Sequence, residues 1–237
     1  MPMDTQVVTP RTARPPLEFD LIADFACPWS FLGKRKLERA LDSLYGLPAP
    51  ALRWHGLRIK AEVPPGSALW RDHLATRLPP GVSVDLAHET LAQAGRDLGI
   101  SFDFARLSRM PDTREAHRLV KLAESEGAHG ALVDALFSAF FEHGQDIGDH
   151  AVLQELGRAR GLALSTLTAF NDPVAGAEQI DAEEKRLQGL GVMATPNLLI
   201  NGRILVPGPA EVSTYVQALD QALFPGLGAS EDRRLLH

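Results

Sequence analysis

The segment LEFDLIADFACPWSFLGKRKLERALDSL, residues 17–44, decides the fold. Apolar residues recur at every second position of its first part, which predicts a largely buried strand. They are Leu17, Phe19, Leu21, Ala23 and Phe25. Apolar residues at three- and four-residue spacing then predict a helix. They are Leu37, Ala40, Leu41 and Leu44. Pro28 suits the first helical position, where a missing N–H costs nothing, so Cys27 is expected where the strand passes into the helix.

This position has chemical consequences for Cys27. Unpaired backbone N–H groups and the positive end of the helix dipole point at a side chain placed there. Both favour a thiolate, and cysteine pKa values at such sites fall to about 3.5–7.5 from about 8.5. We therefore expect Cys27 to be a nucleophile at neutral pH. The alternative is an inert cysteine that packs as a small apolar residue.

The stretch from Asp24 to Lys34 resembles the active-site segment of DsbA-like thioredoxin-fold oxidoreductases, in particular the FrnE-like subgroup. That subgroup typically reads D-x-x-C-P-W-C-Y-x-G-K, and Ser30 stands here at the place of its second cysteine. Cys27 is the only cysteine among 237 residues, so no disulfide can form within the chain. A dithiol–disulfide cycle is thereby excluded for the isolated protomer.

Composition sets broad limits on function. A hydrophobic fraction of 45% with 23% charged residues is ordinary for a globular protein. The net charge of −6 argues against a general nucleic-acid binder and against a basic membrane-binding surface. A single cysteine fits a reducing compartment, and no stretch is long and apolar enough to cross a membrane. Residues 1–16 lack the apolar core of a secretion signal, so we expect a disordered leader and a cytoplasmic protein.

The middle of the chain predicts one further strand and then a long helical region. Residues 51–55 alternate as a strand would. The resemblance implies that this strand leads to a loop near the active site, so Arg53 and Trp54 either border a substrate groove or, for Trp54, pack in the core. From about residue 69 to residue 190 apolar residues recur at helical spacing.

Parts of that region, residues 111–119 and 135–149, resemble the inserted helical domain of the FrnE-like subgroup. Such insertions cover the active-site groove, so His117 either faces a ligand or is satisfied by a partner within the protein. The histidines show no metal-binding spacing, and we expect no metal site.

The last part of the chain returns to strands. Two apolar runs flank Asn201-Gly202, the strongest short signal for a hairpin, and a helix is predicted from Glu211 to Leu223. Thr195-Pro196 resembles the cis-proline site of thioredoxin folds. The resemblance implies that Pro196 is cis and lies opposite Cys27, and that the backbone of Thr195 pairs with the substrate by strand addition.

The predicted fold is a thioredoxin-like α/β fold with a large all-helical insertion. Its parts are a leader at 1–16, a thioredoxin-like first half at 17–65, the insertion at 66–190, a second half at 191–224 and a loose tail at 225–237. The candidate catalytic residues are Cys27 and Ser30. The candidate residues for binding a substrate or thiol are Pro28, Trp29, Thr195 and Pro196.

Three functions are compatible with this sequence. In the first, a DsbA-family thiol-disulfide oxidoreductase acts through Cys27 alone, and glutathione or an analogous small thiol resolves the mixed disulfide with the substrate. In the second, the chain is a glutathione-dependent isomerase or transferase. The 2-hydroxychromene-2-carboxylate isomerases and kappa-class glutathione transferases share this fold and typically read S-P-x-S at Cys27 to Ser30. The third is a non-catalytic thioredoxin-fold binding protein or chaperone.

None of these three functions needs a tightly bound cofactor. The expected partners are a small thiol and a disulfide-containing substrate, with a homodimer left open.

Overall fold

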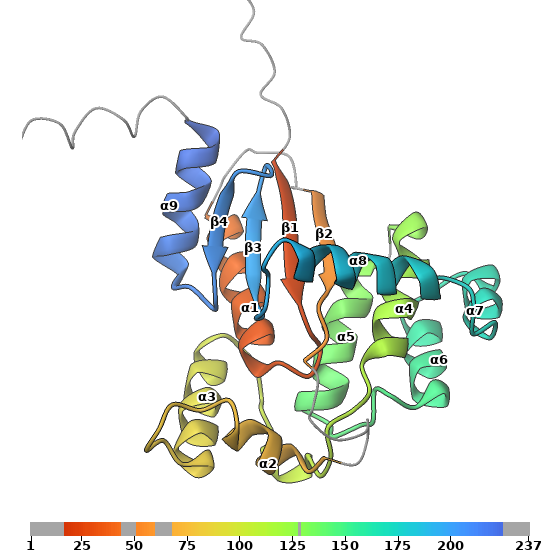
Figure 1. Ribbon diagram of the computed structural model, residues 1–237, viewed down its shortest axis with the longest axis horizontal. Helices are drawn as coiled ribbons and strands as arrows, with labels where there is room; N and C mark the ends of the chain where they lie inside the picture. Colours follow the sequence, from red (N-terminus) through yellow and green to blue (C-terminus); the bar gives the residue numbers. More distant parts are fainter. Residues whose placement is uncertain (1–16, 44–50, 60–67, 128, 225–237) are drawn as a thin grey trace, which may run out of the picture.

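A four-stranded mixed sheet lies at the centre of the computed structural model, which describes residues 17–43, 51–59, 68–127 and 129–224. Its strands are β1 (Glu18–Ala23), β2 (Ala51–Gly56), β3 (Asn197–Ile200) and β4 (Ile204–Pro207). Their order in the sheet is β2-β1-β3-β4 (Figure 1). β1 runs parallel to β2 and antiparallel to β3, which in turn pairs with β4. The end of the chain is thereby placed directly beside its beginning.

The alternation along β1 separates two faces of the sheet. Phe19, Leu21 and Ala23 join the main core together with residues of α1 (Pro28–Asp42). Ile22 points to the opposite face and packs with Leu57 and with Leu187 of α8 (Ala177–Gly189). Figure 1 shows α8 crossing in front of β1 and β2, with α1 behind the sheet. β1 is therefore covered on both faces, as its near-continuous apolar sequence requires.

Among the described residues, six further helices precede α8 between β2 and β3. They are α2 (Trp70–Ala75), α3 (Val84–Asp97), α4 (Arg114–Ala123), α5 (His129–Phe141), α6 (His150–Ala159) and α7 (Leu164–Phe170), with short turns η1 (Phe104–Arg106) and η2 (Glu124–Glu126). Helix α5 is buried on most of its surface and supplies Phe137 and Phe141 to the core. The thioredoxin-like α/β fold with a helical insertion is confirmed. The predicted leader, residues 1–16, and tail, residues 225–237, lie outside the described residues.

The predicted hairpin is confirmed. Asn201, Gly202 and Arg203 join β3 to β4, and the first two have positive φ, of 50° and 65°. Two consecutive positive φ values suit the right-handed twist of a hairpin, and Asn-Gly tolerates them best. Helix α9 (Val212–Leu223) follows and contacts α1 and both strands of the hairpin.

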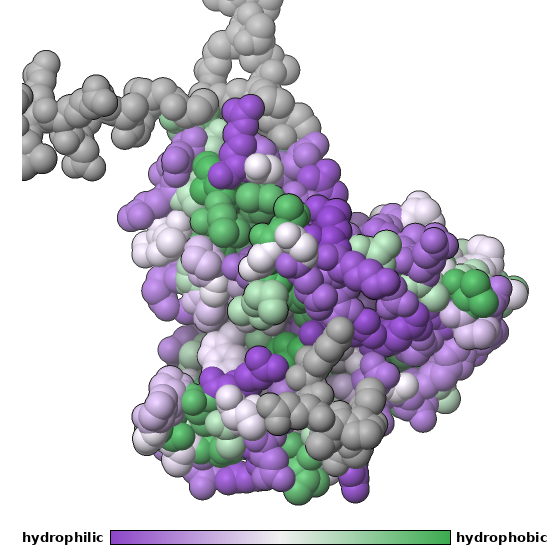
Figure 2. All heavy atoms as spheres, in the orientation of Figure 1, coloured by the Kyte–Doolittle hydropathy of each residue, from purple (hydrophilic) through white to green (hydrophobic). Residues whose placement is uncertain are grey.

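The molecular surface differs between the hairpin and α8. Figure 2 shows an apolar patch over β3 and β4, beside the hydrophilic surface of α8. Leu205 of β4 contributes to the exposed apolar surface, with 57% of its area accessible. No described helix is both long and apolar enough to span a bilayer.

A charge cluster ties the sheet to α8. His55 of β2 places one ring nitrogen 2.7 Å from Asp20 Oδ1 and the other 2.5 Å from Glu183 Oε1. A histidine with a carboxylate on each nitrogen is held as an imidazolium, because both nitrogens must donate. Burial alone would lower the pKa of His55, but the hydrogen bonds to Glu183 and Asp20 outweigh burial and raise it above its ordinary value.

The raised pKa predicts how stability depends on pH. Protonated His55 stabilises the folded chain fully below its unfolded pKa of about 6.5, and this stabilisation is lost as pH rises through the higher folded pKa. We expect His55→Gln to reduce the free energy of unfolding by about 1–3 kcal/mol near pH 6 and by less near pH 9. Urea unfolding of both proteins at the two pH values measures this. An equal loss at both would show that His55 contributes only packing.

Candidate functional site

Cys27 lies where its sequence context places it. It is the N-cap residue of α1, with extended backbone, and Pro28 occupies the first helical position. Its N–H donates to the carbonyl of Asp24 at 3.1 Å, and its own carbonyl accepts the N–H groups of Ser30 at 3.0 Å and Phe31 at 3.3 Å. These backbone bonds hold the turn that connects β1 to α1. They also occupy helix N–H groups that would otherwise be free to face the sulfur.

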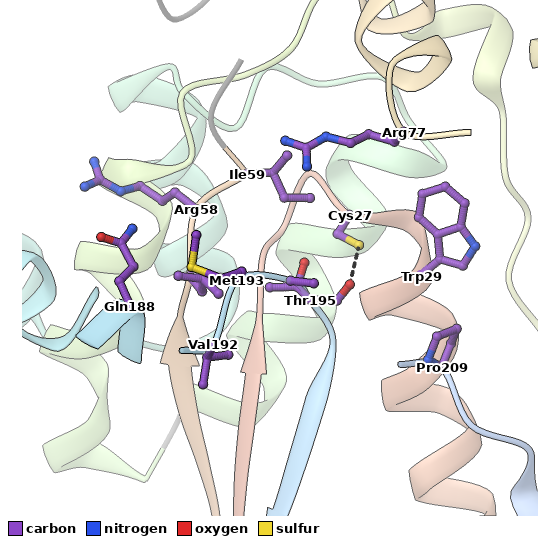
Figure 3. Close-up of a pocket in the computed structure, with 12 residues that line it drawn as sticks. Cys27, Trp29, Arg58, Ile59, Arg77, Gln188, Val192, Met193, Thr195 and Pro209 are labelled. Carbon is purple, nitrogen blue, oxygen red and sulfur yellow. Dashed lines mark hydrogen bonds between the residues drawn. The ribbon is translucent and has the colours of Figure 1, made fainter. Parts of the chain in front are cut away.

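The peptide bond between Thr195 and Pro196 is cis, as predicted. The Cys27 thiol donates to the Thr195 carbonyl, with 3.6 Å between sulfur and oxygen, across 168 positions of sequence (Figure 3). Gly33 makes room for this arrangement, because a Cβ there would lie 3.1 Å from Pro196 Cγ. The pairing of β3 with β1 thus brings the cis-proline segment against the first turn of α1.

A cavity of about 640 Å³ opens beside the thiol. Its lining is Cys27, Trp29, Leu57, Arg58, Ile59, Arg77, Gln188, Val192, Met193, Ala194, Thr195 and Pro209. Of the six residues predicted for the site, Cys27, Trp29 and Thr195 therefore line the cavity. The other three, Pro28, Ser30 and Pro196, are buried and are not part of its wall. Cys27 itself is 1% exposed, and the cavity gives a ligand access to its side chain.

Three polar side chains of the cavity were not foreseen. Arg58 follows β2, Arg77 follows α2, and Gln188 lies near the end of α8 (Figure 3). Arg58 is held by α8, with Nε 2.8 Å from Glu184 Oε2 and a second bond to Asp181. A signal for Arg58 did exist: it follows β2, parallel to the strand before Cys27, and ligand sites gather at the carboxyl ends of parallel strands. No local pattern marks Arg77 or Gln188.

The prediction that Arg53 and Trp54 border the groove is wrong, since neither lines the cavity. Both lie within β2 rather than beyond its carboxyl end. Arg53 points to solvent and pairs with Asp20, with Nε 2.7 Å from Oδ1. Trp54 is 4% exposed and stacks on Phe25 in the core, as in the alternative left open for it.

The prediction of a lowered thiol pKa is also wrong. Burial raises the pKa of Cys27 above its ordinary value, and the nearby charge of Asp24 acts in the same direction. The side chains of Ser30 and Thr195 and the Ser30 amide favour the thiolate but do not compensate for burial. Cys27 is therefore a protonated thiol near pH 7, and it must lose its proton before it can attack.

Asp24 and His117 form a buried polar cluster next to this turn. Asp24 is 0% exposed, and its Oδ1 lies 3.2 Å from His117 Nε2. The other ring nitrogen of His117 accepts from Trp54 Nε1 at 3.1 Å. Of the two interpretations of His117, the structure supports a histidine satisfied by partners within the protein. No three His, Cys, Asp or Glu side chains of the described residues are grouped so as to hold a metal ion.

Known structures of similar fold include oxidoreductases and an isomerase. A "probable DsbA oxidoreductase" of Streptomyces coelicolor is 26% identical, with a TM-score of 0.74 over 87% of this chain and 89% of that one. A 2-hydroxychromene-2-carboxylate isomerase is 16% identical, with a TM-score of 0.66 over 88% and 97%. The cytosolic disulfide reductase DsbM of Pseudomonas aeruginosa, solved with GSH, is 21% identical, with a TM-score of 0.56 over 88% and 96%.

No curated protein sequence matches this chain. The model of the DSBA-like thioredoxin domain matches residues 19–220, which is well over half of the chain. The strand–Cys27–helix turn, the cis-proline opposite it and the helical insertion between β2 and β3 agree with this match. The chain belongs to the family of DSBA-like thioredoxin domains.

Proposed function

We propose that this protein is a monothiol disulfide reductase that uses glutathione, or a similar small acidic thiol, as its co-substrate. One observation carries the proposal. The sulfur of Cys27 forms part of a cavity wall and lies 3.6 Å from the carbonyl that precedes the cis-proline. A ligand in that cavity can present its own sulfur to Cys27 while its backbone pairs with Thr195.

The reaction has two exchange steps. The Cys27 thiolate attacks one sulfur of a disulfide, the S–S bond breaks, and the departing sulfur leaves as a thiolate that takes up a proton. Cys27 then carries a mixed disulfide. A glutathione thiolate attacks the outer sulfur of that bond, releasing Cys27 and forming a new disulfide with the group that Cys27 held. The sum is an exchange in which one glutathione thiol is consumed, one substrate thiol is released and one disulfide replaces another, so a glutathionylated substrate yields its free thiol and oxidised glutathione.

The raised pKa of Cys27 fits a reductase better than an oxidant. A strongly oxidising site stabilises its free thiolate, which makes its disulfides easy to break. Burial at Cys27 does the opposite, because it disfavours the free thiolate relative to a neutral disulfide. Ser30 offers no second sulfur, so an external thiol must release the product. We therefore expect slow, glutathione-dependent reduction of small or glutathionylated disulfides.

The polar side chains of the cavity support an acidic thiol. Arg58 and Arg77 lie on its wall, and guanidinium groups bind carboxylates well. Glutathione carries two carboxylates and an amide backbone. The DsbM neighbour, a cytosolic disulfide reductase solved with GSH, adds to this support at the level of fold, and with it we place the protein in the cytoplasm.

A second candidate is a glutathione-dependent isomerase, which the fold of the 2-hydroxychromene-2-carboxylate isomerase brings into consideration. The observation in its favour is the Cys27 thiol on the cavity wall, whose pKa burial raises. A neutral S–H on the cavity wall can donate a hydrogen bond to the thiolate of bound glutathione, as a serine hydroxyl would. Ser30 cannot take that part directly, because it is buried outside the cavity lining.

The first test is to incubate the protein with oxidised glutathione and to weigh it. We expect one glutathione adduct, on Cys27, which reduced glutathione removes and which Cys27→Ala abolishes. Absence of an adduct, together with tight binding of reduced glutathione that weakens in Cys27→Ala, would favour the second candidate instead. Neither adduct nor binding would leave a non-catalytic binding protein.

A second test uses Ser30→Cys. The side chain of Ser30 is within hydrogen-bonding reach of Cys27, so a sulfur at position 30 can bond to it. We expect this variant to resolve its own glutathione adduct and to accumulate an internal disulfide, visible as the loss of two hydrogens in the intact mass. The matched control Ser30→Ala should keep the adduct on Cys27. A persistent adduct in Ser30→Cys would show that position 30 cannot reach the mixed disulfide.

A further inference from the structure

The helical insertion reaches the thiol site through one buried histidine. His117 of α4 is 3% exposed and contacts Trp54 of β2 on one side and Asp24, directly after β1, on the other. Its Nδ1 lies 3.1 Å from Trp54 Nε1, which can only donate. Nδ1 must therefore be unprotonated, and the ring proton is on Nε2. That nitrogen, 3.2 Å from Asp24 Oδ1, is the donor in the bond to the carboxylate.

The packing fixes the imidazole ring. His117 stacks against Phe25, with ring centroids 4.7 Å apart, and Phe25 in turn stacks on Trp54 at the same separation. Gly56 at the end of β2 leaves room for the ring, since a Cβ there would come within 2.6 Å of His117 Nδ1. A ring flip would place a C–H toward both Trp54 and Asp24. One tautomer of His117, in one ring orientation, therefore satisfies the hydrogen bonds with both Trp54 and Asp24.

Asp24 connects this histidine to the reactive turn. Its carbonyl accepts the N–H of Cys27 at 3.1 Å, and its own N–H donates to Ser30 Oγ at 3.4 Å. Its carboxylate also accepts the N–H of Ala26 at 3.4 Å and that of Ile59, which lines the cavity. The carboxylate is buried close enough for its charge to oppose the Cys27 thiolate. A contact that holds Asp24 in place therefore also affects the reactivity of the Cys27 sulfur.

We propose that His117 is a positioning residue, through which the insertion holds the Asp24 carboxylate against the turn of Cys27 and so sets the reactivity of that thiol. The inference rests on the proposed function, in that Cys27 is taken as the reacting group. The titratable groups that face Asp24 are Cys27 of the turn, His117 of α4 and His73 of α2, and Arg77 acts on His73 in turn.

The direction of the change in Cys27 reactivity follows from the loss of the hydrogen bond between His117 and Asp24. His117→Leu removes the donor that holds the Asp24 carboxylate in this position, so the carboxylate can turn away from the Cys27 turn. A displaced Asp24 carboxylate opposes the Cys27 thiolate less, so more of the thiol ionises at a given pH. The variant Asp24→Asn should have the same result by a direct route. His117→Gln keeps an N–H donor near the position of Nε2 and should behave as the unchanged protein does.

The experiment measures the alkylation rate of Cys27 by iodoacetamide from about pH 5 to about pH 10, read by intact mass. We expect His117→Leu and Asp24→Asn each to react roughly threefold faster or more near pH 7, since half a pKa unit changes the thiolate fraction by about that factor. The double variant should be no faster than Asp24→Asn alone, because the histidine acts through the carboxylate. His117→Gln should restore the original profile.

Two results would overturn the inference. One is a His117→Leu profile that matches the unchanged protein while Asp24→Asn shifts. The other is a ¹⁵N NMR spectrum of the unchanged protein that places the His117 proton on Nδ1. This measurement does not depend on whether a variant folds. His150→Leu, an exposed position on α6, is the matched control and should leave the profile unchanged. Failure of the proposed function would show separately, as a chain that forms no glutathione adduct but still titrates.

Discussion

The pairing of β3 with β1 is the constraint on which the site depends. Leu21 of β1 lies opposite Leu198 of β3, and this register sets the cis-proline segment beside the turn at Cys27. Neither the turn at Cys27 nor the cis-proline segment forms the site alone. A cysteine at the start of α1 has no surface on which to align a substrate backbone, and the Thr195 carbonyl has no sulfur to meet. The contact between sulfur and carbonyl joins residues that the whole helical insertion separates.

Two opposing effects act on that sulfur, and their sizes explain the outcome. A helix N-terminus stabilises a nearby anion by about 0.3–1 kcal/mol, which is less than one pKa unit. Full burial can shift a pKa by up to about 3–5 units in the other direction. Cys27 is 1% exposed, and Pro28 brings no N–H to the first turn. Desolvation therefore prevails over the helix, and Asp24 adds to it.

Local patterns predicted the parts of the fold that depend on neighbours in sequence. The alternation along β1, the Asn201-Gly202 turn and Pro28 at the start of α1 each have a local cause, and each was found where expected. The burial of Cys27 has no local cause, because Leu57 to Ile59 and the segment before Thr195, which surround the cavity together with it, come from distant parts of the chain. The same holds for Arg77 and for the bond between His117 and Asp24. Sequence spacing carries no information about contacts of that range.

The insertion meets the thioredoxin-like part through polar contacts as well as through its core. Arg58, at the end of β2, is bonded to Glu184 and Asp181 of α8, and Asp181 also binds Arg114 of α4 at 2.8 Å. The same helix α4 carries His117 to the thiol turn.

The cavity wall and the carboxylate that opposes the thiolate are thus held by the same two helices. Hydrogen bonds fix the positions of these helices in addition to apolar packing, because each bond weakens steeply outside a narrow range of distance and angle. A helical insertion anchored in this way can fix the distance between the ligand-binding wall and the sulfur, which is the quantity that thiol exchange depends on.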